Sequence, residues 1–137
     1  MKLNTKVRYG LRAMLDIEKN FHGKGILQKE ISQRQDISLK YLDSIITGLR
    51  NGGLIINTGG KGSGYKLAKP ASRIYVYDIY RAFEPELTLV NCLCDSMECN
   101  RTGLCPAKDF WFELNIHLKS LMQNISLKQV MDGTFKF

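Results

Sequence analysis

The sequence lacks any run of apolar residues long enough to cross a bilayer. Its opening, MKLNTKVRYGLRAML, places charges among the apolar positions and lacks the uninterrupted apolar core of a signal peptide. We therefore expect a cytoplasmic protein without a membrane partner, in a compartment that keeps thiols reduced. An apolar fraction of 44% and a charged fraction of 24% exclude a disordered chain. They allow one domain with a modest core, or one domain with an appended helix.

Residues that carry out acid–base or nucleophilic chemistry are scarce. The only histidines are His22 and His117, and neither stands beside a cysteine in the sequence. We expect each to be a surface or packed side chain. No Ser/His/Asp set or pair of carboxylates stands out, so the sequence predicts a protein that is not an enzyme.

Acidic residues are also scarce in the first half of the chain. Residues 1–69 hold 13 Lys or Arg against 5 Asp or Glu, whereas residues 70–137 hold 7 against 8. The excess of positive charge therefore lies entirely in the first half, which is typical of a polyanion-binding domain joined to something else. A basic, solvated surface without a partner would give the same charge balance.

The first fifty residues predict three helices. Apolar residues recur at helical spacing over 5–20, and a second, short helix is expected over 26–34 with Leu27 and Ile31 as its buried pair. Ser38 is a favourable N-cap for a third helix, from Leu39 to about Asn51. The predicted apolar stripe of this third helix consists of Leu39, Leu42, Ile45, Ile46 and Leu49.

A short helix, a tight turn and a second helix with a polar face predict a helix-turn-helix, although any three-helix bundle would show the same stripes. Two features favour DNA binding. The exposed face of the third helix carries side chains that can bond base edges and phosphates. A β-hairpin then follows, with strands at 54–57 and 64–67 and a glycine-rich tip whose only charge is Lys61. A helix-turn-helix followed by such a hairpin is a winged helix.

The second half predicts a short helix over 76–83 and a longer one from Pro106 to about Asn124. Ser126 is expected to cap a last short turn through Val130. The long helix could pack on its own wing domain, but we favour a partner helix from a second chain, giving a two-fold homodimer. Its predicted apolar face consists of Phe110, Trp111, Leu114, Leu118 and Leu121. The expected fold is mainly α with a small β wing. We divide it into a winged helix-turn-helix domain (1–83), a cysteine-rich loop (84–105), and a dimerisation helix with its tail (106–137).

All four cysteines fall within fourteen residues, at Cys92, Cys94, Cys99 and Cys105. Clustered thiolates suit an iron–sulfur cluster or zinc. The spacing contains neither the paired CxxC knuckles of common zinc sites nor a ferredoxin-type run. From spacing alone, a cluster, zinc, a thiol redox pair and four unligated thiols all stay open.

With these motifs in place, the sequence resembles the IscR/NsrR/CymR family of bacterial winged-helix transcription regulators, and most closely the IscR branch. The resemblance covers nearly the whole chain. The residues that carry it are the opening TKVRY and RAMLD, the ISLKYLD stretch, the wing ending GSGYKLAKPAS, a three-cysteine loop and the late NISL. It implies a homodimer that binds a pseudo-palindromic operator in duplex DNA. It also implies an iron–sulfur cluster, [2Fe–2S] or [4Fe–4S], that tunes this binding, with zinc as the second candidate.

Cys92, Cys99 and Cys105 fall where the family has three cysteine ligands. The chain departs from the family at the fourth ligand. Lys108 stands where the IscR branch has histidine, and Arg8 stands where the nitric-oxide sensors have a carboxylate. Our hypothesis is that the additional thiol of Cys94 replaces the missing ligand.

The resemblance also assigns the residues expected to contact DNA. The family arginine that enters the minor groove from the wing is Gly59 here, and Lys61 is expected to compensate for it. Phosphate contacts are expected from Lys2, Arg8, Gln28, Lys40 and Lys61. The recognition-helix positions are Ser38, Lys40, Tyr41, Asp43 and Ser44. The sequence thus predicts a DNA-binding regulator that senses iron–sulfur, redox or nitric oxide status. A zinc or thiol regulator on the same scaffold and a small iron–sulfur electron-transfer protein are the alternatives.

Overall fold

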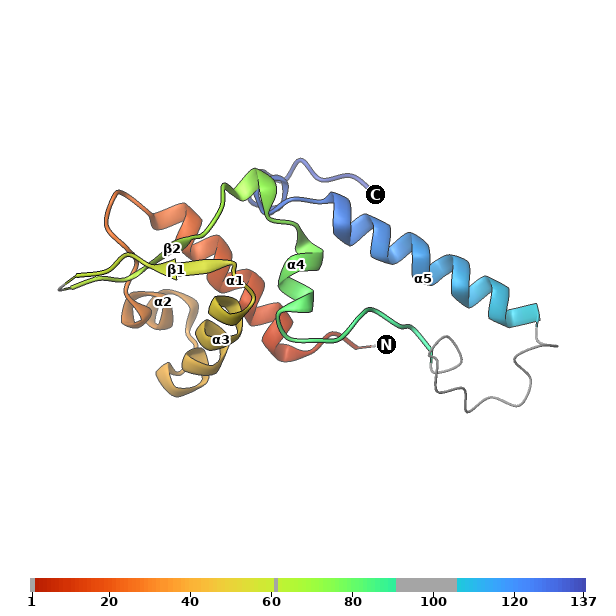
Figure 1. The fold of residues 1–137 in the computed structure, drawn as a ribbon, viewed down its shortest axis with the longest axis horizontal. Coiled ribbons are helices and arrows are strands. Elements are labelled where there is room, and N and C mark those ends of the chain that lie inside the picture. Colours follow the sequence, from red (N-terminus) through yellow and green to blue (C-terminus); the bar gives the residue numbers. More distant parts are fainter. Residues whose placement is uncertain (1, 61, 91–105) are drawn as a thin grey trace.

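A computed structural model describes residues 2–60, 62–90 and 106–137. The described residues are mainly helical with one small antiparallel sheet (Figure 1), so the predicted fold class is confirmed. The elements in chain order are α1 Thr5–Asn20, α2 Gln28–Gln35, α3 Leu39–Asn51, β1 Ile55–Asn57, β2 Tyr65–Leu67, the 3-10 turn η1 Ala71–Arg73, α4 Val76–Arg81, α5 Pro106–Asn124 and α6 Leu127–Asp132.

The tight turn of the helix-turn-helix is made by three consecutive residues. Asp36 takes the left-handed conformation, with φ 53°, and ends α2. Ile37 is buried and anchors the turn in the core. The Ser38 hydroxyl then accepts a hydrogen bond from the Tyr41 amide at 3.1 Å, which confirms it as the N-cap of α3. The predicted bounds of α1, α3 and α5 agree with the structure.

Two predicted core positions are wrong. Leu27 is 39% exposed, while its neighbour Ile26 is 1% exposed. Helix α2 begins only at Gln28, so Leu27 is an extended cap residue that points away from the core. Leu39 is 51% exposed and is the first residue of α3, one turn before the buried part of the stripe begins at Leu42. Ile31 and the other four residues of the predicted α3 stripe are buried as expected.

The wing is a short hairpin that is also fastened at its base. Its strands pair in antiparallel register, with Ile55 opposite Leu67. Ile26 and Tyr65 exchange two backbone hydrogen bonds of 2.8 Å, so the segment before α2 adds a third strand-like edge. A Cβ on Gly64 would lie 2.5 Å from the carbonyl carbon of Ile26. The two backbones therefore cross at a distance that only glycine allows.

The C-terminal part of the chain returns to the winged module. The amide of Leu127 donates to the carbonyl of Ile74 at 2.7 Å, and that of Val76 donates to Ile125 at 2.9 Å. Leu127 is fully buried in the same apolar core as Met14 and Leu49. Ser126 and Gln129 cap α6 reciprocally, so the predicted cap is confirmed. The three-part domain division stays a prediction, and the return of Leu127 ties its last part to the first.

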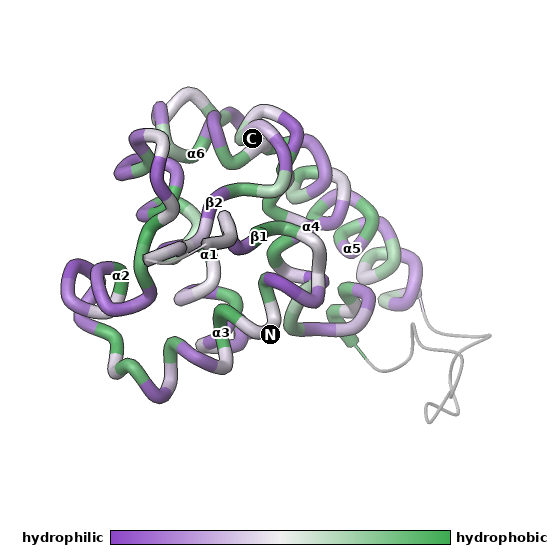
Figure 2. Tube along the Cα trace, turned by 60° about the vertical axis from the view of Figure 1, so that its left-hand side comes forward, coloured by the Kyte–Doolittle hydropathy of each residue, from purple (hydrophilic) through white to green (hydrophobic). Residues whose placement is uncertain are grey.

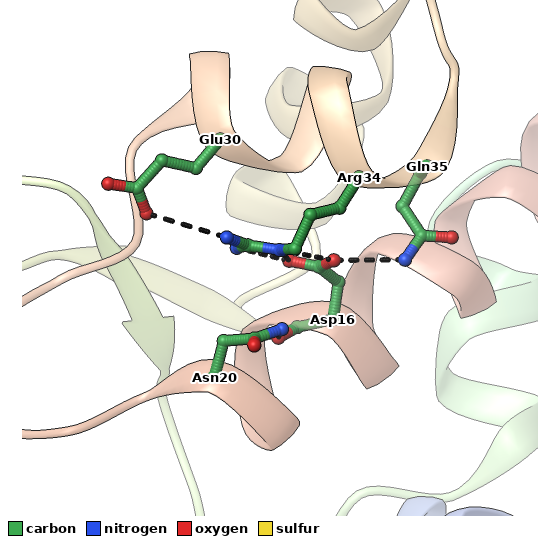
Figure 3. Close-up of polar contacts among 5 residues, drawn as sticks. All are labelled: Asp16, Asn20, Glu30, Arg34 and Gln35. Carbon is green, nitrogen blue, oxygen red and sulfur yellow. Dashed lines mark hydrogen bonds and ion pairs between the residues drawn. The ribbon is translucent and has the colours of Figure 1, made fainter.

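A buried carboxylate joins α1 to α2 (Figure 3). The Asp16 side chain is 1% exposed, and its oxygens accept hydrogen bonds from Arg34 Nη2 at 2.8 Å and Arg34 Nε at 3.0 Å. Gln35 Nε2 donates to the same carboxylate at 2.9 Å. The hydrogen-bonded carboxylate raises the pKa of the Arg34 guanidinium above its ordinary value. Glu30, 3.9 Å from Arg34, adds an exposed and much weaker pair.

We predict that Asp16→Asn lowers the free energy of unfolding by about 1–3 kcal/mol, because the charge-assisted hydrogen bonds that the buried carboxylate accepts from Arg34 are lost. Glu30→Gln is the matched control, since it removes the other acidic partner of Arg34 and should change the value by less than about 0.5 kcal/mol. Urea denaturation at one fixed protein concentration measures both variants. Equal effects of the two substitutions would contradict this account of the α1–α2 contact.

Candidate nucleic-acid interface

The five predicted recognition residues all lie at the N-terminal end of α3. Ser38, Lys40 and Asp43 are exposed, whereas Tyr41 and Ser44 are half-buried. The Ser44 hydroxyl donates to the Tyr41 carbonyl at 2.8 Å, so its hydrogen is engaged and its lone pairs remain to accept. This end of α3 therefore carries one cation, one carboxylate and three hydroxyl groups.

Gln28 lies beside this surface but is held by α3. Its Nε2 is 3.3 Å from Asp43 Oδ1 and 3.4 Å from the Leu39 carbonyl oxygen. Gln28, which is expected to contact a DNA phosphate, therefore lies next to the recognition residue Asp43. The carboxylate of Asp43 is oriented by this contact, and a fixed carboxylate can accept from the amino group of cytosine.

An aromatic contact links α1 to the same end of α3. The rings of Tyr9 and Tyr41 meet edge to face with centroids 5.7 Å apart. The Arg12 guanidinium lies 5.0 Å from the Tyr9 centroid and donates to Gln35 Oε1 at 3.2 Å. Arg12 is not among the residues that the sequence predicted for this surface. The sequence signal for this contact is the spacing of three residues between Tyr9 and Arg12, because residues three apart are neighbours on a helix surface.

The remaining predicted DNA contacts fall outside α3. Lys2 and Arg8 are exposed, before and within the first turns of α1, and Arg8 Nη2 donates to Thr5 Oγ1 at 3.2 Å. Lys61 lies outside the described residues. On either side of it, Gly59, Gly60 and Gly62 have φ of 78°, 85° and 73°. These left-handed positions favour glycine, so the described part of the tip presents backbone without side chains.

The four predicted cluster ligands, Cys92, Cys94, Cys99 and Cys105, also lie outside the described residues. The chain just before them is fastened to α5. Asn115 Oδ1 accepts from the Leu89 amide at 2.8 Å, and Asn115 Nδ2 donates to the Leu87 carbonyl at 3.1 Å. An ion pair of Glu86 with Lys119 runs beside it. Their side-chain hydrogen bond lowers the pKa of Glu86 and raises that of Lys119.

The described residues supply no metal site of their own. Within 2–60, 62–90 and 106–137, no three His, Cys, Asp or Glu side chains come together in a way that could hold an ion. Lys108 lies half-buried in the first turn of α5, and its ammonium cannot act as a ligand.

The long helix α5 is poorly covered. Figure 1 shows it running outward from the winged module, and Figure 2 shows apolar positions along it. Within the described part of the chain, no side chain of α5 is buried. Between α5, α6 and the tail lies an open groove of about 310 Å³, lined only by the apolar residues Leu3, Val76, Leu118, Leu121, Met122, Ile125, Val130, Phe135 and Phe137. Among the described helices, none combines the length and apolar character needed to cross a membrane.

Comparisons with known proteins agree with this geometry. The sequence model of the Rrf2 family, described as iron-dependent transcriptional regulator, matches residues 3–133. The chain is 33% identical to the HTH-type transcriptional regulator IscR of Escherichia coli, over 97% of this chain and 82% of that one. It is 36% identical to Protein rrf2 of Nitratidesulfovibrio vulgaris, over 96% and 87%. These relatives are regulators, so the expectation that the protein is not an enzyme is confirmed.

Two solved structures are similar over nearly the whole chain. T. potens IscR superposes with a TM-score of 0.76 at 28% identity, covering 97% of this chain and 88% of that one. CymR of B. subtilis superposes with a TM-score of 0.79 at 28% identity, covering 98% of each. The resemblance drawn from the sequence is therefore confirmed.

We predict that Lys40→Gln weakens binding to duplex DNA and makes the slope of log affinity against log salt shallower by about 1, because one phosphate contact is lost. Lys128→Gln is the control: Lys128 is an exposed cation of α6, paired with Asp132 at 3.3 Å. Fluorescence anisotropy over a salt series on one duplex measures both slopes. Wild-type slopes for both variants would remove Lys40 from the interface.

Proposed function

The chain belongs to the Rrf2 family of transcriptional regulators, and from that premise we propose a homodimer that binds a duplex operator under the control of a cysteine-ligated iron–sulfur cluster. The observation that carries the DNA-binding part is the exposed end of α3, where Lys40, Tyr41 and Asp43 stand together. Each α3 would enter a major groove, with half-sites roughly 34 Å apart or a multiple of that distance. The wing and Arg8 would reach the flanking phosphates.

The exposure of α5 supports the dimer. Leu114 is 40% exposed and Trp111 is 37% exposed, on the same side of α5 as the apolar groove. A helix places residues two apart about 200° from each other, so Ile116, 46% exposed, faces the other way from Leu114. A second copy packed along the groove side would cover a continuous apolar stripe and meet the same stripe of its partner, as a two-fold interface requires.

We predict that Leu114→Lys raises the dissociation constant of the dimer by about 30-fold or more, the size expected for a residue at the centre of an interface. Ile116→Lys makes the same change at a similarly exposed position on the opposite side and should stay within about twofold of wild type. Sedimentation equilibrium measures both. Equal dissociation of the two variants, or none in either, would contradict the assignment of this side of α5 to the interface.

The cluster part of the proposal depends on the chemistry of the donor set. Four thiolates in fourteen residues suit iron and sulfide, whereas Lys108 and Arg8 offer no lone pair at the positions where relatives have other ligands. We assign Cys92, Cys94, Cys99 and Cys105 as the ligands, with Cys94 as the fourth. A bound cluster would supply a centre that responds to oxidation and to ligands such as nitric oxide. Asn115, which fastens residues 87–89 to α5, would connect this segment to the rest of the molecule.

We predict that protein prepared without oxygen contains iron and sulfide with visible absorption, and that Cys94→Ala and Cys99→Ala each lose most of it. Ser96→Ala alters the same segment without removing a thiol and should keep the wild-type spectrum. Metal and sulfide analysis together with absorption provide the measurement. A wild-type spectrum in Cys94→Ala would remove this residue from the ligand set, and zinc without sulfide would replace the cluster by a zinc site.

A thiol-based regulator on the same scaffold is the second candidate. It is favoured by the similarity to Staphylococcus aureus CymR described as an oxidized form, with a TM-score of 0.74 at 32% identity over 96% of this chain. In that case two of the four cysteines would form a disulfide on oxidation. A small electron-transfer protein would leave the winged module without a role.

A further inference from the structure

The ring of Phe83 occupies an unusual place between two helices. Phe83 follows α4, and its amide donates to the Tyr80 carbonyl at 3.1 Å. One edge of the ring meets Gly10 of α1, where an added Cβ would lie 2.6 Å from Cε2. The opposite edge meets Gly48 of α3, where an added Cβ would overlap Cε1 and lie 2.9 Å from Cδ1. The ring therefore fills a space that exists only because both helices have glycine there.

Both glycines stand inside helices, where glycine is the least favourable residue after proline. Neither has a left-handed φ that would require glycine for the backbone. Close packing against Phe83 is thus the one feature of the described structure that calls for glycine at these two sites. A ring held at both edges fixes the separation and rotation of α3 relative to α1.

Phe83 also belongs to two apolar clusters. It packs on the main core, which contains Ile45 and Leu49 of α3. It also packs on a second cluster formed by Val7, Tyr80 and Leu87, which Leu118 and Met122 of α5 join. Gly48 lies five to ten residues along α3 from the exposed recognition residues Ser38, Lys40 and Asp43, about 8–15 Å at the rise of a helix. Because α3 is one continuous helix, a shift of the ring at Gly48 would also move Lys40 and Asp43.

We propose that Phe83 is a positioning residue for DNA recognition: it holds α3 in register with α1 and with the α4–α5 cluster. The proposal rests on the proposed function, in which α3 reads the operator. A side chain that only filled space would affect the stability of the fold and nothing else. A positioning residue must also affect the ratio of specific to non-specific DNA affinity, because base contacts depend on the placement of α3 more steeply than phosphate contacts do.

The test uses the full chain and two probes. The specific probe is a duplex enriched by the wild-type protein from a random-sequence pool, and the non-specific probe is a mixed-sequence duplex of the same length. Gly48→Ala pushes the ring, and we expect the ratio of the two affinities to fall about tenfold. Phe83→Leu alone should lower it about threefold. In the double variant the smaller side chain makes room for the added methyl, so the ratio should recover to within about threefold of wild type. Phe21→Leu, at a phenylalanine 40% exposed, is the control and should leave the ratio unchanged.

The outcomes separate this proposal from the one on which it depends. If the wild-type protein enriches no duplex, the proposed function fails. If the wild-type protein does enrich a duplex, the single variants decide. When they lower the specific and non-specific affinities equally, or lower only the urea midpoint, Phe83 is a packing residue and the proposal is overturned. The proposal would also be overturned if the double variant showed the same low ratio of specific to non-specific affinity as Gly48→Ala alone. Should Gly48→Ala not fold, Phe83→Leu alone decides by the same ratio.

Discussion

The arrangement of the winged module depends on one buried carboxylate. Asp16 is almost fully removed from water, and Arg34 and Gln35 of α2 satisfy its oxygens. A buried charge is tolerated only when it is paired and hydrogen-bonded, so this contact allows few orientations of α2 on α1. Because only Asp36 and Ile37 separate α2 from the cap of α3, the direction of α3 follows from the same contact. The orientation of the surface that would face DNA is thus determined by a contact between α1 and α2, the two helices that also bring Tyr9 and Gln28 to the end of α3.

Two close approaches, one between backbones and one between a ring and a helix, determine the positions of the wing and of α3. Gly64 allows the wing to cross the strand-like edge at Ile26, and Gly48 allows α3 to close on Phe83. Leu127 brings the C-terminal turn back into the main core, so α5 is tied to the module at its C-terminal end. Near the middle of α5, Asn115 holds the chain that leads into the cysteine segment. A change at those cysteines would therefore reach α5 and the cluster around Phe83 through packed, hydrogen-bonded contacts.

Periodic apolar residues and caps predicted most of the fold, because these signals are local. The bounds of α1, α3 and α5 and the caps at Ser38 and Ser126 follow from them. The prediction errors arise where the burial of a side chain depends on residues that are distant in the sequence. Leu27 and Leu39 look like core residues by spacing, but each lies at the start of a helix, where its side chain is exposed. The burial of Asp16 depends on Arg34, eighteen residues away, and the glycines at 10 and 48 have meaning only beside Phe83. Among the site residues, the cluster at the end of α3 was predictable from one helix, whereas the contact of Arg12 with Tyr9 and Gln35 required the assembled fold.

The central claim is that two copies of α3 read one duplex in successive major grooves. Methylation interference on a duplex enriched by the wild-type protein tests it directly, since methylation at guanine N7 blocks contacts in the major groove. The account predicts two patches of interference with two-fold symmetry, whose centres lie about 10 base pairs apart or a multiple of that spacing. A single patch, or binding that is indifferent to major-groove methylation, would contradict it.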